Sequence, residues 1–349
     1  MQTMINSWKS PVVLAPMAGV TDRVFRRICR AHKSGAAYTP MVSAKSVLYD
    51  NRTAFDLMQT DQGEENLALQ LFGHEAEDIA AAIEHIDLTP YTWLDINMGC
   101  PAPKIVRQGE GSALMLDLPN AEKIIRAAVK VSPIPVSVKF RKGWDDDHIN
   151  AVEFARMAQD AGAAMICVHP RTQRQMYTGK ADLGMLQAVI DAVEIPVIAS
   201  GDVKDGASAK RALDMGAAAV MIGRASFGDP WLFARIDSYL KTGEELPSPT
   251  QQERLCTSVA HARMLVEDLP ERVAMLQMRK HVAWYIHGIA GAGKMRAAVN
   301  DTTRLCDLEE CISSFACEAI GIDRDAFFDC VDDVYTNIMQ NAAANACSI

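Results

Sequence analysis

The feature that most constrains this 349-residue chain is an alternation of strand and helix patterns over its first two thirds. Short apolar and β-branched runs predict eight strands, and amphipathic stretches predict the helices between them. The predicted strands are residues 12–17, 37–42, 66–71, 93–97, 136–140, 165–169, 197–200 and 219–222. The clearest predicted helices are residues 22–33, 75–85, 120–131, 148–161, 183–193 and 205–215. Eight such units predict an α/β protein with a (β/α)8 TIM barrel. An open doubly wound sheet would give a similar alternation, but no GxGxxG follows the first strand, where residues 18–21 are AGVT.

The alternation stops at a turn-rich stretch, residues 242–249 (TGEELPSP), which predicts a linker. Only helical patterns follow it, at about 251–268, 271–287 and 294–305, with one or two more before the end. We therefore expect a barrel over 1–242 that holds the catalytic site. A small all-helical domain should follow over 250–340, with a tail at 341–349.

Composition narrows the class of protein without naming a function. No apolar run approaches the roughly 18–20 residues of a membrane span, and the start lacks the basic and apolar regions of a secretory signal. Nine cysteines with no CxxC indicate reduced thiols and a cytoplasmic location. The net charge of −9 is concentrated in residues 306–349, which carry nine acids against Arg324 alone. The rest of the chain is nearly neutral, so its charge does not exclude RNA as a partner.

Polar and ionisable residues stand at the ends of the predicted strands, where this fold builds its active sites. The residues at these ends include Gln70, Asn97, Cys100, Lys139, Arg141, His169, Arg171, Asp202 and Arg224. Buried cations cost several kcal/mol unless they meet an anion or a partner. The predicted rim therefore suits a ligand that carries negative charge.

The ends of the last two strands favour a phosphate group. Small residues at Ser200-Gly201 and at Gly223 let backbone N–H groups approach an anion, and Arg224 can bind it with two hydrogen bonds. The loops after strands seven and eight are the usual phosphate site of this fold. Either glycine alone would fit a tight turn, but both together with Arg224 favour a phosphate-bearing cofactor or substrate.

Two further residues offer chemistry. Lys139 suits either a Schiff base or the neutralisation of a developing anion in a flavin ring. Cys100 lies on a turn between Gly99 and Pro101, and a thiol with a pKa of about 8.5 is protonated at neutral pH, so it can act as an acid as well as a nucleophile. The other cysteines fall in helical or strand patterns, and those after residue 305 fit no zinc or iron–sulfur spacing, so we expect no metal. His169 fits a structural hydrogen bond as well as a cofactor contact.

Five motifs together resemble the tRNA-dihydrouridine synthases. They are residues 14–22 (LAPMAGVTD), 95–101 (DINMGCP), 138–144 (VKFRKGW), 168–172 (VHPRT) and 222–225 (IGRA). The bacterial B-type gives the nearest resemblance, with residues 279–285 (RKHVAWY) in the helical region. The similarity covers about residues 8–305.

The resemblance implies an FMN enzyme that uses NADPH to reduce selected tRNA uridines to 5,6-dihydrouridine. Hydride would pass from reduced FMN to C6 of the uracil, and Cys100 would protonate C5. The residues expected to bind FMN are Pro16, Met17, Ala18, Gln70, Lys139, His169, Ser200, Gly201, Asp202, Gly223 and Arg224. Ser200 stands where the family usually has Asn, so its contact with FMN is expected to be lost or to run through water.

The resemblance also implies contacts with RNA and no obligate protein partner. Asn97 would contact the extruded uracil, with Arg171 nearby, and Lys104 and Arg107 would meet RNA at the rim. Arg279 and Lys280 would bind RNA in the helical domain. Without the resemblance, the stripe at 279–281 fits a solvated basic surface equally well.

Three alternatives remain at this stage. One is an FMN barrel oxidoreductase acting on a free pyrimidine or a dihydroorotate-like substrate, which needs no helical domain. Another is a Schiff-base aldolase that uses Lys139 and carries no flavin. The last is a catalytically idle RNA-binding protein, in which replacing Cys100 would change nothing measurable.

Overall fold

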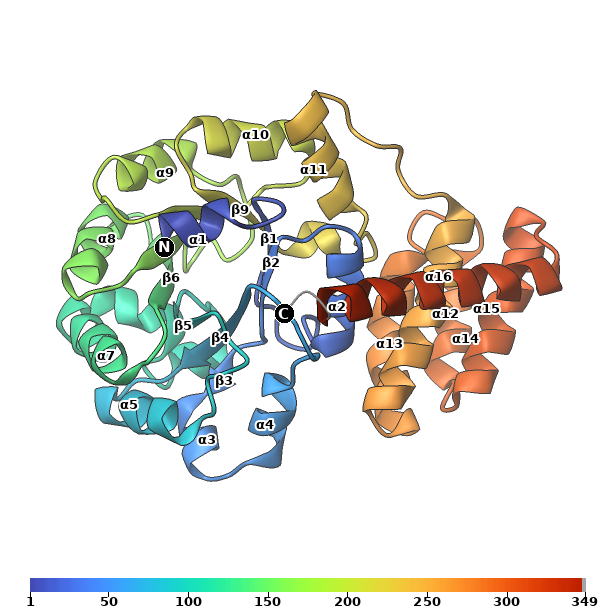
Figure 1. Ribbon diagram of the computed structural model, residues 1–349, viewed down its shortest axis with the longest axis horizontal. Coiled ribbons are helices and arrows are strands. Elements are labelled where there is room, and N and C mark those ends of the chain that lie inside the picture. The colour runs from blue at the N-terminus through green and yellow to red at the C-terminus, as the bar shows by residue number, and fades with distance from the viewer. Residues whose placement is uncertain (347–349) are drawn as a thin grey trace.

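A closed parallel barrel forms the larger part of the computed structural model, which describes residues 1–346 (Figure 1). Its strands are β1 (Val12–Leu14), β2 (Ala36–Tyr38), β4 (Leu67–Phe72), β5 (Trp93–Met98), β6 (Val136–Gly143), β7 (Met165–Thr172), β8 (Val197–Ser200) and β9 (Ala219–Ile222). Each pairs in parallel with its neighbours, and pairing of β9 with β1 closes the ring. The predicted (β/α)8 barrel is confirmed.

The second predicted strand differs from expectation, because it is divided in two. β2 pairs with β1 and β4, whereas the two residues of β3 (Val42–Ser43) pair only with the end of β4. Pro40 lies in the break, and proline has no N–H to donate to a sheet. The chain between the two pieces brings Met41 to the carboxyl end of the barrel.

The helices around the barrel begin at local signals in the sequence. They are α1 (Gln2–Asn6), α2 (Arg23–Ala31), α3 (Ala44–Leu48), α4 (Arg52–Met58), α5 (Ala76–His85), α6 (Pro103–Val106), α7 (Leu118–Val131), α8 (Ala151–Asp160), α9 (Leu183–Ile190), α10 (Gly206–Asp214) and α11 (Leu232–Thr242). Four of them, α2, α7, α9 and α10, follow an aspartate whose carboxylate accepts the backbone N–H three residues later. Such caps satisfy N–H groups that the helix leaves without partners.

The barrel interior is packed with side chains at its amino-terminal end. Ala36, Trp93, Met165 and Ala219, each the first residue of its strand, are among the buried residues there. Trp8, just after α1, stacks on Trp93 with ring centroids 5.6 Å apart. This packing closes that end, so a ligand can enter only from the carboxyl ends of the strands.

Five helices follow the linker and lie together beside the barrel (Figure 1). They are α12 (Gln251–Asp268), α13 (Glu271–Tyr285), α14 (Ala292–Asp301), α15 (Leu305–Ile320) and α16 (Arg324–Ala346). Their apolar cluster includes Val24 and Ile28, so α2 of the barrel completes the core of the helical part. α16 continues through most of the stretch expected to form a tail, and residues 347–349 lie outside the described part of the chain. No helix within 1–346 combines the length and apolar composition needed to cross a bilayer.

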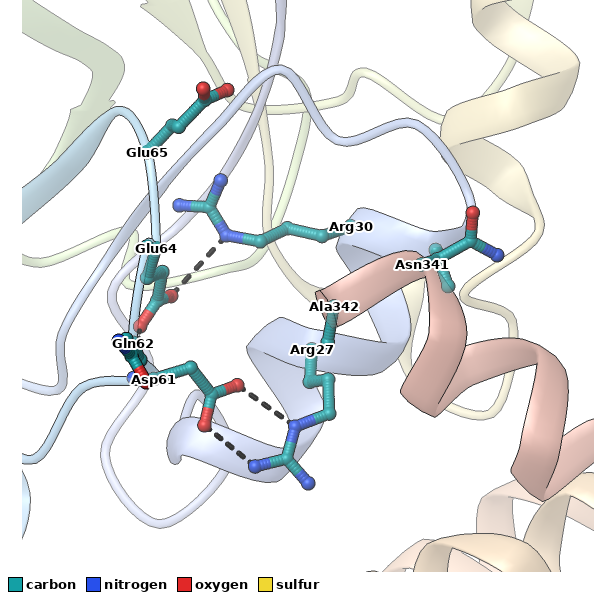
Figure 2. Close-up of a pocket in the computed structure, with 10 residues that line it drawn as sticks. Arg27, Arg30, Asp61, Gln62, Glu64, Glu65, Asn341 and Ala342 are labelled. Carbon is teal, nitrogen blue, oxygen red and sulfur yellow. Dashed lines mark hydrogen bonds and ion pairs between the residues drawn. The ribbon is translucent and has the colours of Figure 1, made fainter. Parts of the chain in front are cut away.

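Arginines of α2 join the barrel to the last helix. Figure 2 shows Arg27 paired with Asp61 and Arg30 with Glu64, while the end of α16 lies on the other side of a small pocket. Arg27 binds both oxygens of Asp61, at 2.8 and 2.6 Å, and also contacts Met339 of α16 at 3.5 Å. α2 is therefore held by charges on one side and by apolar packing on the other.

Candidate functional site

A cavity of about 710 Å³ opens at the carboxyl ends of the strands. It is lined by all the residues expected to bind the cofactor, together with Cys100 and Asn97: Pro16, Met17, Ala18, Gln70, Asn97, Cys100, Lys139, His169, Ser200, Gly201, Asp202, Gly223 and Arg224. These residues come from seven loops or strand ends spread over more than 200 positions of sequence. The closed barrel brings them together, because all its parallel strands end at the same face.

Cations without anionic partners face this cavity. Within the part of the chain that the structure describes, the side chains of Lys139 and Arg224 have no hydrogen-bond or ion-pair partner. The Arg224 guanidinium lies 4.4 Å from the centre of the Tyr177 ring. Lys139 is half-buried and Arg224 is exposed, so both are available to bind an anionic ligand.

Gly201 and His169 fit together tightly on the same wall. Gly201 has a φ of +102°, and a Cβ there would lie 2.7 Å from Cδ2 of His169. Burial, together with the nearby charges of Lys139 and Arg141, holds the pKa of His169 well below its usual 6.5. The imidazole is therefore neutral at physiological pH, so it serves as a hydrogen-bond group and not as a charge.

Cys100 is a protonated thiol at the wall of the cavity. Burial raises its pKa above the ordinary 9.0, although the Ala102 N–H and the charges of Arg141 and Lys139 act in the opposite direction. The thiol thus keeps its proton at neutral pH, which suits a proton donor better than a thiolate nucleophile.

The turn that carries Cys100 is held from several sides. The Cys100 carbonyl accepts hydrogen bonds from the backbone N–H and the hydroxyl of Ser112, at 3.0 and 2.9 Å. Gly111, at φ +61°, allows this approach, because a Cβ there would lie 2.8 Å from the same carbonyl oxygen. Arg141 Nε donates to the Gly99 carbonyl at 2.8 Å. These contacts fix the turn next to the cavity.

Arg141 is a site residue to which sequence reasoning gave no role. Besides Gly99, its guanidinium binds the carbonyls of Thr172 and Met176 at 3.0 and 2.8 Å. Burial, with the nearby charges of Arg171 and Arg224, lowers its pKa from 12.5 to about 10, so it stays charged. Its position two residues after Lys139 on one strand was an available signal, because alternate strand residues face the same side.

Met41, Tyr177 and Phe227 also line the cavity without having been predicted. Tyr177 lies between two arginines, with its ring centre 5.6 Å from the Arg141 guanidinium and 4.4 Å from that of Arg224. It belongs to a loop with no pattern of its own, so nothing in the sequence indicated it.

Arg171 is not itself a lining residue, but it lies directly behind the cavity wall, with Nη1 3.3 Å from Nε2 of the lining residue His169. Its Nη2 binds both carboxylate oxygens of Asp202 at 2.8 Å and the Gly179 carbonyl at 2.9 Å, and its Nε binds the Thr178 carbonyl at 3.0 Å. All its main donors are used inside the protein. Arg171 therefore positions the loop at 178–179 and Asp202.

Lys104 and Arg107 are exposed beside the cavity mouth, next to the lining residues Ala102 and Pro103. Lys280 already has a hydrogen-bond partner within the protein. Its Nζ donates to the Gly19 carbonyl, in the loop between β1 and α2, so it is a contact between the two parts of the chain. Arg279 is only partly exposed, and its Nε is buried without a partner in the described structure. The basic stripe is thus largely packed against the barrel.

One helix, α13, braces two loops of the cavity. Lys280 binds the loop after β1, and one helical turn later Trp284 stacks on Phe227 in the loop after β9, with ring centroids 4.2 Å apart. Gly228 allows this contact, because a Cβ there would lie 2.5 Å from the Trp284 backbone. The helical part therefore supports the cavity wall directly.

The chain is similar to known proteins over most of its length. The dihydrouridine synthase (Dus) family model matches residues 13–319. A probable tRNA-dihydrouridine synthase of Rickettsia bellii is 41% identical over 295 residues, covering 83% of this chain and 90% of that protein. tRNA-dihydrouridine synthase B of Pseudomonas aeruginosa is 38% identical over 304 residues, covering 84% and 90%. A probable tRNA-dihydrouridine synthase 1 of Synechocystis is 41% identical over 289 residues, covering 82% and 81%.

Proposed function

Because the chain belongs to the dihydrouridine synthase family, we propose that it reduces selected uridines in tRNA to 5,6-dihydrouridine. One observation carries this proposal: residues from all five motifs that resemble the family line a single cavity. That cavity combines unpaired cations with a protonated cysteine. An aldolase using Lys139 would not need such a thiol.

We propose FMN as the bound cofactor and NADPH as its reductant. The cavity is within the usual size of small-molecule sites, and its donors suit the group. Arg224 and the backbone at Gly201 and Gly223 would hold the phosphate, while Gln70 and Lys139 would hold the ring. When bound, FMN would supply the hydride that reaches C6 of the uracil.

The protein's own groups would supply the rest of the chemistry. Hydride addition at C6 leaves negative charge on the uracil, which needs a proton at C5 and a donor near a carbonyl oxygen. Cys100 would give the proton. We assign the cationic donor to Arg141, because Arg141 lines the cavity and binds the turn that carries Cys100, while Arg171 lies behind the same wall. Asn97 would contact the uracil.

A uridine in folded tRNA must be extruded before it can enter such a cavity. Lys104 and Arg107 would then bind RNA phosphates at the rim, and residues 250–340 would hold the rest of the tRNA against the barrel. Lys294 and Arg296 of α14 are exposed and suit that role.

Anaerobic spectroscopy tests the proposal. Protein loaded with FMN should be bleached by NADPH and recover its flavin absorbance when unmodified tRNA is added. Recovery with free uracil or orotate but not with tRNA would favour the small-pyrimidine enzyme. Failure to bind FMN at all would refute the cofactor assignment.

Replacement of Cys100 tests the proton donor. Cys100→Ala should leave reduction by NADPH intact and slow reoxidation by tRNA by about 10²–10⁴-fold, because one proton transfer loses its acid. Cys306→Ala, at an exposed cysteine far along the chain, is the matched control and should behave as wild type. Equal reoxidation rates in the two variants would exclude Cys100 as the donor.

A further inference from the structure

We infer that Asp95, a buried aspartate of β5, is a positioning residue that orients the Cys100 turn and the amide groups facing the cavity through Gln70 and Asn97. The effect of Asp95 on catalysis rests on the proposed function, whereas the hydrogen-bonded arrangement itself is a property of the protein whatever its function. Asp95 does not line the cavity, so it cannot touch a ligand there.

The link from Asp95 to Cys100 is a continuous chain of hydrogen bonds. Gln70 Nε2 donates to Asp95 Oδ2 at 2.7 Å, and Asn97 Nδ2 donates to Gln70 Oε1 at 2.9 Å. Asn97 Oδ1 in turn accepts the backbone N–H groups of Cys100 and Gly99, at 2.9 and 3.1 Å. Asp95 and Gln70 are fully buried and Asn97 nearly so. Water therefore has little access to replace a lost bond.

Both ends of this chain impose the same direction on the two amides. A carboxylate only accepts hydrogen bonds, and a backbone N–H only donates them. If Gln70 turned its oxygen toward Asp95, two acceptors would face each other, and the Asn97 amide would lose its acceptor. Neither amide can reverse alone, and a satisfied polar network of this kind specifies one arrangement.

The surroundings of Asp95 keep it an acceptor at neutral pH. Burial raises its pKa from 3.8 to about 6, against hydrogen bonds from Ser137 and Gln70 and the charge of Lys139. The other titratable groups near it are Cys167 on β7 and Tyr38 on β2. Burial raises the pKa of both, so they are neutral.

The orientation of the Gln70 and Asn97 amides in this series of hydrogen bonds decides whether donors or acceptors face the cavity. Asn97 lines the cavity and keeps some exposed surface, and its Nδ2 has a second hydrogen that no described residue accepts. The Asn97 amide can therefore donate to a ligand, which suits a carbonyl oxygen of a uracil or a flavin ring. The same orientation holds the backbone of the proton donor beside it.

Amide hydrogen exchange of the flavin-free protein tests the chain directly. In Asp95→Ala, a peptide spanning residues 97–102 should exchange about fivefold faster, because the acceptor of the Gly99 and Cys100 N–H groups is no longer held. Ser137→Ala is the matched control: it removes a hydrogen bond from the same carboxylate but leaves Gln70 in place, so protection should be unchanged. Equal protection in Asp95→Ala and wild type would overturn the inference.

Asp95→Asn separates positioning from general stability. Its amide oxygen can accept from Gln70 while its NH₂ donates to Ser137, so at pH 8 the reoxidation rate by tRNA should stay within about threefold of wild type. Asp95→Ala should slow this step by on the order of 10- to 100-fold and affect reduction by NADPH much less. Protonation of Asp95 as pH falls through about 6 should likewise leave this rate within about threefold, because the acid, like the amide, keeps an oxygen that accepts from Gln70.

The outcomes distinguish the two proposals. If tRNA does not reoxidise even the wild-type flavin, the proposed function fails, while hydrogen exchange still decides the role of Asp95. If Asp95→Ala does not fold, Gln70→Ala takes its place in the exchange measurement, because it removes the group through which Asp95 holds Asn97. An equal loss in both half-reactions would reduce Asp95 to a packing residue.

Discussion

The buried ion pair between Arg26 of α2 and Glu64 gives a stability prediction whose size follows from the structure. Two hydrogen bonds join the side chains, at 2.8 and 2.9 Å, and their exposed fractions are 0% and 2%. Arg26 also donates to the carbonyls of Thr21 and Gln59, at 3.0 and 2.7 Å. The pair therefore anchors the loop that runs from β1 past the cavity into α2.

Two estimates of the effect of Glu64→Gln agree. Burial alone would raise the pKa of Glu64, but the charge and hydrogen bonds of Arg26, with Arg30 nearby, lower it from 4.5 to about 2. At about 1.4 kcal/mol per pKa unit, the folded protein favours the charged carboxylate by roughly 3 kcal/mol. Removing one partner of a buried pair costs about 3–5 kcal/mol. Because the amide that replaces the carboxylate would keep one acceptor for Arg26, we expect a loss of about 3 kcal/mol, at the lower end of that range.

Urea unfolding at pH 7, followed by tryptophan fluorescence, measures this loss. At an m value of about 3 kcal/mol/M the midpoint should fall by about 1 M. Glu65→Gln is the matched control, because the neighbouring carboxylate pairs with the mostly exposed Lys9, at 3.4 Å, and should cost less than about 1 kcal/mol. Since the pKa of Glu64 is depressed, its contribution is present above pH 4.5 and lost as pH falls from 4.5 toward 2. Equal midpoints for the two variants would refute the reasoning.

Two further predictions concern histidines and a glycine. Burial lowers the pKa of His261 to about 3 and that of His281 well below 6.5, so in acid the unfolded chain binds more protons than the folded protein. The free energy of unfolding should therefore fall below pH 6.5, by up to about 1.4 kcal/mol per pH unit for each histidine. Urea titrations at pH 7 and pH 5 should show a smaller fall for His281→Phe than for wild type. Gly201→Ala should cost about 2 kcal/mol or more and weaken flavin binding measured by fluorescence, because its Cβ would meet His169 at 2.7 Å. Gly321→Ala, with positive φ but nothing within 4 Å, should show only the backbone cost of about 1–2 kcal/mol, and equal effects would contradict the steric argument.

The barrel and most of the cavity were accessible from the sequence for one physical reason. Once strands alternate with helices around a closed ring, every strand end lies on the same face, so residues as far apart as Gln70 and Arg224 can be assigned to one site without knowing their contacts. The break at Pro40 shows the limit of this approach, since the apolar pattern continues where hydrogen bonding stops.

The sequence could not show which of two residues of the same type faces the cavity. Arg141 and Arg171 both stand at strand ends, and it takes the folded structure to show that Arg171 is already engaged, above all by Asp202, 31 residues later. Lys280 lies in a basic, aromatic stretch of the kind that can bind RNA, yet its side chain donates a hydrogen bond to Gly19, 261 residues away. The partners in both cases are distant in sequence, so local patterns carry no information about them.

The position of α13 limits how far the two parts of this protein can change independently. Lys280 and Trp284 commit one face of that helix to the barrel, so only its other faces and the neighbouring helices can vary without disturbing the cavity wall. A chimera that takes its helical part from another member of the family, joined at the linker, must keep the contacts that Lys280 and Trp284 make with the barrel. Otherwise the loops after β1 and β9 would lose their contacts with α13, and the cavity wall would lose that support.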